Sequence, residues 1–168
     1  MTLSPSARRV KSKKIIKCLL GSSFFRKAQN IVIYFPLPGE VDTRPLIDRA
    51  LFLNKNVFLP RVHPARGALE VFQIRDSSKE LKKGYCGIRE PRASQFFKGR
   101  PQKMDLIIVP GLGFDKSGRR LGRGEGHFDR FLRKTIRATK IGLAFKEQVL
   151  TKIPADARDV RVDKIITD

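Results

Sequence analysis

The sequence predicts an α/β fold: a single three-layer domain over residues 1–168, in which a mostly parallel sheet has helices on both faces. Three observations lead to this prediction. Short apolar runs rich in β-branched residues alternate with helical patterns, as expected of parallel strands joined by helices. The runs at 30–35 and 104–109 are apolar almost throughout, which indicates strands covered on both faces. No internal repeat or low-complexity linker divides the chain.

Six segments are predicted to be strands from their apolar or alternating patterns. In residue numbers they are 30–35, 56–59, 69–74, 104–109, 140–145 and 163–167. The alternation at 69–74 is typical of an edge or hairpin strand, and Pro60 is expected to end the strand before it. The polar stretch at 76–103 is rich in turn residues, and we expect mostly loop and short helix there.

Helices are predicted around and between these strands. Ser4 is a favourable N-cap in front of Pro5, so a basic helix is expected to run to about Leu20. Asp42 or Thr43 is expected to cap the next helix. Further helices are predicted at 126–138 and, in short form, from 147 to 150.

The composition favours an intracellular, reduced protein, which we expect in the cytoplasm. Cys18 and Cys86 are too few for a disulfide framework, and we interpret both as structural. Only His63 and His127 could join them, and the spacing does not suit a metal site. No apolar run approaches the roughly 20 residues of a membrane span, and the first apolar stretch is too short for a signal sequence.

The chain is strongly basic, with 36 Lys and Arg against 16 Asp and Glu and a formal net charge of +20. Such a charge attracts nucleotides, polyglutamylated cofactors or nucleic acid, although a solvated basic surface explains it equally well. The sequence shows no RNP, KH, zinc-finger or helix-turn-helix signal, and its aromatic residues do not interleave with the basic ones. A nucleic-acid-binding protein is therefore a rival hypothesis, and no specific nucleic-acid partner is expected.

The most informative stretch is 109–132, VPGLGFDKSGRRLGRGEGHFDRFL. Glycines alternate at 122, 124 and 126, so the backbone can approach a ligand and direct N–H groups at it. Three arginines lie nearby, and the predicted helix start at Gly126 favours anions. The pattern is neither a Walker A loop nor a Rossmann fingerprint. It indicates a phosphate site, with a flexible turn as the alternative.

This stretch resembles the signature of the 5-formyltetrahydrofolate cyclo-ligase family. The matching residues are Pro110, Gly111, Phe114, Asp115, Gly118, Arg120, Leu121, Gly122, Gly124, Gly126 and Asp129. Further segments match in the same order: YFPLPGEVDT at 34–43, Pro60-Arg61, GIREP at 87–91, Pro154, and DVRVDKIIT at 159–167. The resemblance covers roughly residues 4–168 and rests on several separate motifs.

The resemblance implies an ATP- and Mg²⁺-dependent ligase of one-carbon metabolism. It would convert 5-formyltetrahydrofolate, with or without a polyglutamate tail, to 5,10-methenyltetrahydrofolate, releasing ADP and phosphate through a phosphorylated formyl (iminium phosphate) intermediate. Such a reaction needs charge neutralisation at the phosphates more than a dedicated acid or base. A monomer that acts without a membrane is expected.

The resemblance also implies roles for particular residues. The expected catalytic residues are Arg120, Arg123 and Asp129. The expected ATP-binding residues are Arg120, Leu121, Gly122, Arg123, Gly124, Glu125, Gly126, His127 and Phe128. The expected folate-binding residues are Phe35, Glu40, Arg123, Gly124, Gly126 and His127. Asp129 and Asp163 are expected to hold the metal.

Structural roles are the alternatives for four of these residues. Asp129 could only favour its helix dipole, and Asp163 could only cap the last strand. Glu40 could be a solvated turn residue, and Phe35 could belong to the core. A relative that keeps the fold and binds folate or nucleotide without turnover is a further rival for the chain as a whole.

The chain departs from the family pattern at three places. His127-Phe128 replaces the family's Tyr-Tyr, and Arg158 replaces a His. Family members also carry an N-terminal helix whose Lys and Arg reach ATP, followed by Leu-Ser-Pro; this chain begins at Met1 with Leu3-Ser4-Pro5 just behind it. We expect that this helix is absent or that the start lies further upstream.

Overall fold

The computed structural model describes residues 3–63, 65, 67–84, 87–92, 97–154 and 156–168. The helices are α1 (Pro5–Leu20), α2 (Ser23–Lys27), α3 (Arg44–Phe52), α4 (His127–Leu132), and the 3₁₀ turns η2 (Pro101–Lys103) and η3 (Lys146–Gln148). The strands are β1 (Asn30–Val32), β2 (Asn56–Val62), β3 (Leu69–Ile74), β4 (Leu81–Lys83), β5 (Arg89–Pro91), β6 (Leu106–Val109), β7 (Gly113–Asp115), β8 (Arg120–Leu121), β9 (Thr139–Leu143), β10 (Val149–Leu150) and β11 (Lys164–Ile166).

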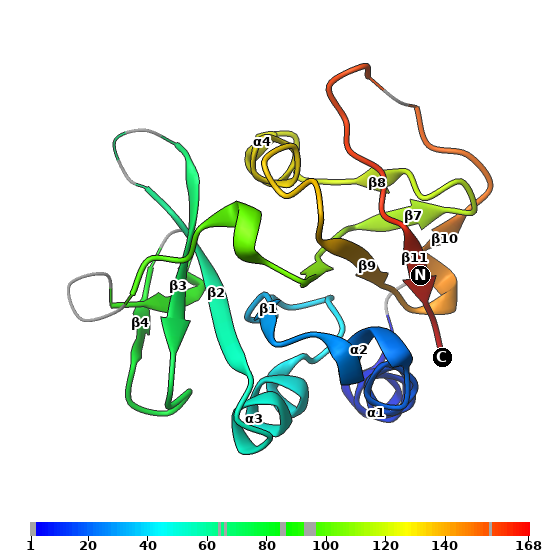
Figure 1. Ribbon diagram of the computed structural model, residues 1–168. Coiled ribbons are helices and arrows are strands. Elements are labelled where there is room, and N and C mark those ends of the chain that lie inside the picture. Colours follow the sequence, from blue (N-terminus) through cyan, green and yellow to red (C-terminus); the bar gives the residue numbers. More distant parts are fainter. Residues whose placement is uncertain (1–2, 64, 66, 85–86, 93–96, 155) are drawn as a thin grey trace.

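A six-stranded sheet in the order β11-β9-β6-β1-β2-β3 forms the centre of the molecule (Figure 1). All neighbouring strands are parallel except β2 and β3, which form an antiparallel hairpin at one edge. The predicted α/β fold with a mostly parallel sheet is therefore confirmed, as is the hairpin strand at 69–74. In the centre, Ile31 of β1 lies beside Leu106 of β6, and every residue of β6 is buried.

Helices cover both faces of this sheet, as predicted. On one face α1, α2 and α3 pack with fully buried side chains, among them Ile15, Leu19 and Leu46. On the other face α4 contributes Phe131 and Leu132 to a second apolar cluster (Figure 1). Burying a side chain of this size stabilises the fold by about 1.5–3 kcal/mol relative to leaving it exposed.

The prediction that Pro60 ends the second strand is wrong, because β2 continues to Val62 and Pro60 pairs with Val71 of β3. The Phe58 carbonyl accepts a hydrogen bond from Ile33 on the β1 side of β2, at 2.9 Å. Since alternate residues of a strand face the same side, Pro60 also faces β1, which has already ended at Val32. The next bond of this parallel ladder would run from the N–H of residue 60 to the Ile33 carbonyl, so the missing N–H of proline ends the pairing of β2 with β1 while β2 continues against β3.

Two predicted helices differ from the structure. The helix predicted at 126–138 ends at Leu132, because Thr135 donates from both its N–H and its Oγ1 to the Leu132 carbonyl. Residues 147–150 were expected to begin a helix, but only the 3₁₀ turn η3 forms there. Val149 and Leu150 instead form β10, which lies beside β7 in a small sheet of order β10-β7-β8.

The polar region at 76–103 also contains the two-stranded sheet of β4 and β5, which was not predicted. The predicted strands at 30–35, 104–109, 140–145 and 163–167 are each shorter in the structure than expected. Cys18 is exposed with a free thiol, and Cys86 lies outside the described residues. Among the described residues, no helix is long and apolar enough to cross a membrane.

The small sheet holds two features that shape the following loop. Phe114 of β7 is fully buried against Gly111 and Gly142, where an added Cβ would lie 2.7 Å and 2.6 Å from its ring. The buried carboxylate of Asp115 accepts hydrogen bonds from the Ser117 hydroxyl and the N–H groups of Arg119 and Ile153. The Ser117 hydroxyl is the main cause that lowers the pKa of Asp115 to about 2. The chain that leads into β8 is thereby held on a rigid base.

Candidate functional site

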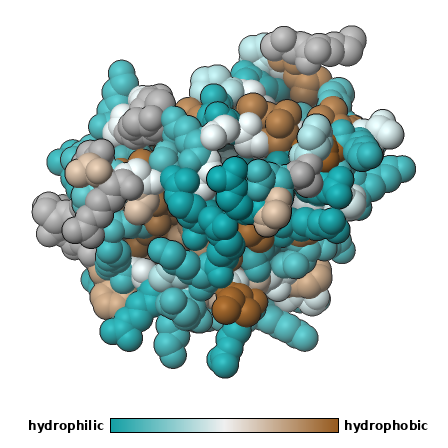
Figure 2. Space-filling view, turned by 90° about the horizontal axis from the view of Figure 1, so that it is seen from above, coloured by the Kyte–Doolittle hydropathy of each residue, from teal (hydrophilic) through white to brown (hydrophobic). Residues whose placement is uncertain are grey.

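A cavity of about 910 Å³ lies beyond the carboxyl ends of the central strands. It is lined by residues that follow β1 and β6, by the end of β2, by β8 with the glycine-rich loop and α4, and by the segment around 153–159. Ligands of open α/β sheets bind at this edge because the strand ends and their loops meet there. Figure 2 shows the face of the molecule on the α4 side, which is largely hydrophilic with scattered hydrophobic patches.

The structure brings together the site residues predicted from sequence, with one exception. Those that line the cavity are Phe35, Glu40, Arg120, Leu121, Gly122, Arg123, Gly124, Glu125, Gly126, His127, Phe128 and Asp129. The exception is Asp163. Residues as far apart in the chain as Phe35 and Asp129 thus share one cavity, because the loops after β1 and β8 meet at the same edge of the sheet.

The glycines of the loop are required for different physical reasons, either backbone conformation or lack of space for a side chain. Gly124 and Gly126 have φ angles of +91° and +64°, a left-handed backbone that side-chain-bearing residues rarely adopt. Among the described residues, no atom beyond the chain neighbours of Gly124 lies within 4 Å of an added Cβ, so the loop is open at that point. Gly122 instead lies against Arg120, whose Nη1 would be 2.7 Å from an added Cβ. The loop backbone therefore curves closely around this guanidinium.

Arg120 and Asp129 form an ion pair inside the cavity wall. Arg120 Nη2 donates to Asp129 Oδ2 at 2.7 Å, and the two side chains are 8% and 14% exposed. Asp129 Oδ1 accepts a hydrogen bond from the Val160 N–H at 3.2 Å. The Nε of Arg120 is buried and has no hydrogen-bond partner among the described residues, so this guanidinium retains a donor. The ring of Phe128 lies 5.8 Å from its central carbon.

His127 is the centre of a second polar group. Its Nε2 lies 2.7 Å from Glu125 Oε2, and its Nδ1 lies 2.7 Å from Arg130 Nη2. Arg130 also donates to the carbonyls of Glu125 and Gly67, at 3.1 Å and 3.2 Å. Since Gly67 belongs to the turn between β2 and β3, Arg130 joins the glycine-rich loop to that hairpin.

Glu40 lies in the loop between β1 and α3 and faces the same cavity. Its Oε2 accepts a hydrogen bond from the Leu37 N–H at 2.9 Å. Burial raises the pKa of Glu40 above its ordinary value of 4.5, and the Leu37 N–H and the charge of Arg123 oppose this shift only in part. Arg123 itself is exposed, which leaves its guanidinium accessible to a ligand.

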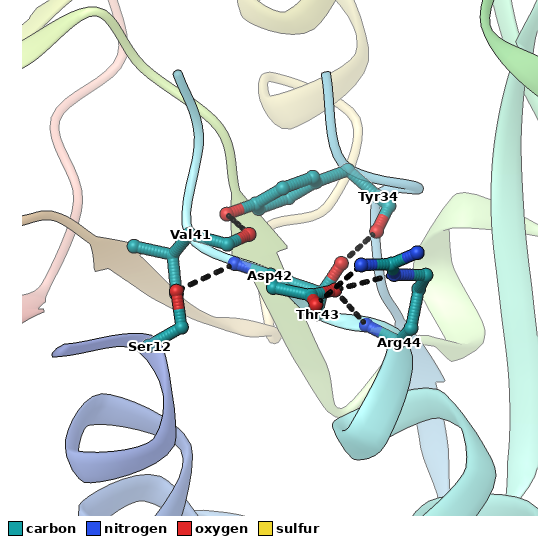
Figure 3. Close-up of polar contacts among 6 residues, drawn as sticks. All are labelled: Ser12, Tyr34, Val41, Asp42, Thr43 and Arg44. Carbon is teal, nitrogen blue, oxygen red and sulfur yellow. Dashed lines mark hydrogen bonds and ion pairs between the residues drawn. The ribbon is translucent and has the colours of Figure 1, made fainter. Parts of the chain in front are cut away.

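The loop that carries Glu40 is closed at its base by three hydrogen bonds (Figure 3). The Tyr34 hydroxyl donates to the Val41 carbonyl at 3.2 Å, and the Thr43 hydroxyl donates to the Tyr34 carbonyl at 2.6 Å. The Asp42 N–H donates to Ser12 Oγ of α1 at 3.0 Å. Burial raises the pKa of Tyr34 well above its ordinary value, so the phenol keeps its proton and remains a donor.

The same segment explains the start of α3. Thr43 occupies the N-cap position, but its side chain makes no capping bond because its hydroxyl serves Tyr34. The Oδ1 of Asp42 accepts the Arg44 N–H at 3.2 Å, and both Asp42 oxygens accept from the Arg44 guanidinium at 2.7 Å (Figure 3). Asp42 and Thr43 therefore share the role that the sequence prediction gave to one or the other.

Asp163 does not line the cavity, contrary to the metal site predicted for it. Its Oδ2 accepts the Lys140 N–H at 2.7 Å, and its own N–H donates to the Lys140 carbonyl at 2.8 Å. Lys140 is near the start of β9, so Asp163 lies toward the amino-terminal edge of the parallel strands, whereas the cavity lies at the carboxyl edge. Its observed contacts are those of a residue that caps the last strand.

The structure adds cavity residues to which sequence analysis gave no role. Asp159 lines the cavity from the closing segment, and its Oδ2 accepts the Asp156 N–H at 2.8 Å. Arg61 lines it from β2, with its Nε 4.0 Å from the buried Glu90 of β5. Both residues lie inside motifs that resemble the family, Pro60-Arg61 and the segment from 159. These motifs were the sequence feature that could have identified them as cavity residues.

Fold and cavity together define an α/β protein whose arginine-bearing, glycine-rich loop forms one wall of a cavity at the carboxyl edge of the sheet. The chain matches the 5-formyltetrahydrofolate cyclo-ligase family over residues 2–168. It belongs to this family of ATP-dependent ligases in folate metabolism.

Particular relatives agree with this assignment. The chain is 30% identical to the 5-formyltetrahydrofolate cyclo-ligase of Mus musculus, over 98% of this chain and 85% of the relative. It is 33% identical to the enzyme of that name from Haemophilus influenzae, over 84% and 76%. Among solved structures, 5,10-methenyltetrahydrofolate synthetase of Aquifex aeolicus superposes with a TM-score of 0.85 at 35% identity, over 98% of this chain and 81% of that one. The synthetase of Mycoplasma pneumoniae shares the fold, with a TM-score of 0.78 at 24% identity.

Proposed function

We propose that this chain catalyses the ATP- and Mg²⁺-dependent conversion of 5-formyltetrahydrofolate to 5,10-methenyltetrahydrofolate, with release of ADP and phosphate. The observation that carries the proposal is the convergence of Arg120, Arg123 and the glycine-rich loop with Glu40 and Phe35 on one cavity. Membership of the cyclo-ligase family supports it independently. The proposal treats residues 1–168 as one catalytic domain that acts as a cytoplasmic monomer.

The phosphates of ATP are assigned to the arginine-bearing wall. Arg123 is exposed in the cavity, and Arg120 keeps a buried Nε donor that has no partner among the described residues. The open backbone at Gly124 gives a phosphate close access to loop N–H groups. Guanidinium groups hold phosphate oxygens through strong charge-assisted hydrogen bonds. The loop therefore offers a phosphate both backbone N–H donors and the positive charge of arginine side chains.

The cavity suits a magnesium ion held jointly by protein and nucleotide. Among the described residues, no group of three or more Asp, Glu, His or Cys side chains could hold a metal alone. Mg²⁺ in phosphoryl-transfer sites is commonly held by one or two carboxylates together with phosphate oxygens. Asp129 and Asp159 both line the cavity and could supply those carboxylates. The ion would neutralise charge on the phosphates, so that Asp129 would exchange part of its pairing with Arg120 for the metal.

The reaction that we propose needs stabilised charge at each step. The formyl oxygen attacks the terminal phosphorus of ATP and ADP leaves, which gives an iminium phosphate. The neighbouring folate nitrogen then attacks the formyl carbon, phosphate leaves and that nitrogen loses its proton. Arg120 and Arg123 would stabilise the negative charge on the transferred phosphoryl group in both steps.

The folate side of the cavity is assigned to Phe35 and Glu40. Glu40 is held by the Leu37 N–H in a loop that three further hydrogen bonds close, so its carboxylate has a fixed position for pterin N–H donors. Phe35 lies beside Arg89, whose guanidinium carbon is 5.6 Å from the ring centre. His127, Arg123, Gly124 and Gly126 also line the cavity, and we assign them to the space between the two substrates. The basic cavity rim suits a polyglutamate tail.

The test is an absorbance assay for methenyltetrahydrofolate with the purified chain, 5-formyltetrahydrofolate, ATP and Mg²⁺. We expect product only when ATP and Mg²⁺ are both present. Release of ADP in equal amount to the product would support the proposed stoichiometry. A folded chain that binds 5-formyltetrahydrofolate but forms no product would overturn the catalytic proposal in favour of the non-catalytic relative.

A further inference from the structure

The helices α1 and α2, which cover one face of the sheet, carry positive charge and no negative charge. Residues 3–27 contain eight Lys and Arg residues and no Asp or Glu. Six of the eight side chains are exposed, and we call them the basic helical surface. They are Arg9, Lys13, Lys14, Lys17, Arg26 and Lys27.

The cations of the basic helical surface are not neutralised by nearby carboxylates. Within the described residues, none of the six takes part in an ion pair. Lys11, on the same helix but half-buried, differs because it pairs with Glu147 and Asp168. Some exposed cations elsewhere, such as Lys98 beside Glu70, do have a carboxylate partner. The charge of this surface is therefore available to an external polyanion.

The cations on α1 form a row. Arg9, Lys13 and Lys17 are spaced four residues apart, so they lie on one side of the helix at intervals of about 6 Å. The opposite side of α1 is occupied, since Ile15, Ile16 and Leu19 are buried in the core. The helix thus presents a straight, regularly spaced line of charge about 12 Å long.

The basic helical surface does not overlap the cavity. No residue of α1 or α2, both of which lie within the described part of the chain, is among those that line it. In Figure 1 these helices lie on the side of the sheet opposite α4, which carries Asp129. A ligand on this surface would leave the proposed cyclo-ligase site open.

We infer that the basic helical surface binds the phosphate backbone of nucleic acid without reading base sequence. Backbone contacts need Lys and Arg at regular spacing and supply non-specific affinity through counterion release. A membrane would require a free apolar face, but the apolar face of α1 is already buried. Protein interfaces are depleted in Lys, which dominates this row. The surface also lacks base-stacking aromatics between its cations on α1.

The test measures how the affinity for a labelled DNA duplex depends on salt, by fluorescence anisotropy. The variant Arg9→Gln/Lys13→Gln/Lys17→Gln removes the row. Its matched control is Lys103→Gln/Lys116→Gln/Lys152→Gln, which removes the same charge from exposed positions elsewhere. Each lost phosphate contact lowers the slope of log K against log salt concentration by about 0.9. We expect the slope of the row variant to fall by roughly 2–3 and that of the control to stay near the wild-type value.

A second readout localises the contact. Cys18 is an exposed free thiol one residue beyond Lys17, and its alkylation can be followed by mass spectrometry of its own peptide. DNA should slow this alkylation, and high salt should remove the protection. Equal loss of binding in the two triple variants would show that net charge alone acts and would overturn the inference. Binding to anionic vesicles but not to DNA, through the same row, would overturn it as well. Cyclo-ligase activity should be the same in all three proteins, so failure here leaves the proposed function intact.

Discussion

His127 and Arg130 fix each other's hydrogen-bonding state. The Nδ1 of His127 lies 2.7 Å from Arg130 Nη2, and a guanidinium group only donates. Nδ1 must therefore accept, so the ring proton resides on Nε2, which donates to Glu125 Oε2 at 2.7 Å. Arg130 in turn reaches the Gly67 carbonyl of the β2–β3 turn. His127, which stands where the family has the first Tyr of Tyr-Tyr, thus helps to position Arg130, the arginine that joins the glycine-rich loop to the β2–β3 turn.

Replacing Arg130 with Ala should raise the KM for ATP several-fold and leave kcat nearly unchanged. The reason is that the variant loses the bonds from Arg130 to the Glu125 carbonyl and to His127 Nδ1, together with the link to Gly67. Steady-state kinetics with ATP varied at saturating folate measures the effect. Arg137→Ala, an exposed arginine of the same region that does not line the cavity, is the control. An equal effect in both variants would show that the link to Gly67 is irrelevant.

Asp129→Asn should abolish Mg²⁺-dependent turnover and leave the fold intact. Asparagine keeps an oxygen for the Val160 N–H but no longer neutralises Arg120. The loss of a hydrogen bond between charged groups should lower the free energy of unfolding by about 1–3 kcal/mol. Chemical denaturation and the absorbance assay at several Mg²⁺ concentrations measure both effects. Near wild-type activity in this variant would show that Asp129 is not a metal ligand.

Arg123→Ala should raise the KM for ATP about 10–100-fold, because a charge-assisted hydrogen bond contributes about 1.5–3 kcal/mol. Its melting temperature should change little, since the side chain is exposed. Arg120→Ala should raise the KM for ATP more than that for folate and should also destabilise the fold, because it leaves Asp129 without its partner. If the KM for folate rose more than that for ATP, the phosphate assignment would be wrong.

Glu40→Gln should stabilise the protein at neutral pH while weakening folate binding. Burial raises the folded-state pKa of Glu40, so the folded protein holds this proton more tightly than the unfolded chain. The stability from this proton is complete below the unfolded pKa and is lost as pH rises through the folded pKa. Glutamine stays neutral and keeps an acceptor for Leu37.

Thermal unfolding near pH 7 and near pH 4 tests the predicted direction of this stability change. The melting temperature of the variant should exceed that of the wild type near pH 7, and the difference should shrink near pH 4. A variant that is less stable than the wild type near pH 7 would show that the carboxylate has a stabilising partner. The KM for 5-formyltetrahydrofolate, measured in parallel, separates the loss of binding from the change in stability.

The sequence was sufficient for the layers of the fold and for most of the cavity. Local patterns specify β6, whose four residues are all buried, and α1, whose Ser4 accepts the Ala7 N–H as an N-cap should. The glycine-rich loop could be placed because its motif is contiguous. The residues that line the cavity from distant segments were found through family-like motifs rather than through periodicity.

What sequence reasoning missed depends on tertiary contacts. Pro60 ends the pairing with β1, but nothing near it in the sequence indicates that β2 continues against β3 on its other side, so that continuation could not be predicted. Thr135 ends α4 through a bond to Leu132 that helix propensity does not describe. Asp159 and Asp163 look equivalent in sequence, and only the pairing of Asp163 with Lys140 separates the cavity residue from the strand cap.

The close contact of Phe114 with Gly111 and Gly142 has an evolutionary consequence. An alanine at either glycine would place its methyl group within 2.7 Å of a fully buried ring, so neither position can grow while the phenylalanine remains. A smaller residue at 114 would in turn leave a void beneath the strand that leads to the glycine-rich loop. These three positions, 31 residues apart at their extremes, are therefore epistatic, and a lineage can change one of them only by changing another.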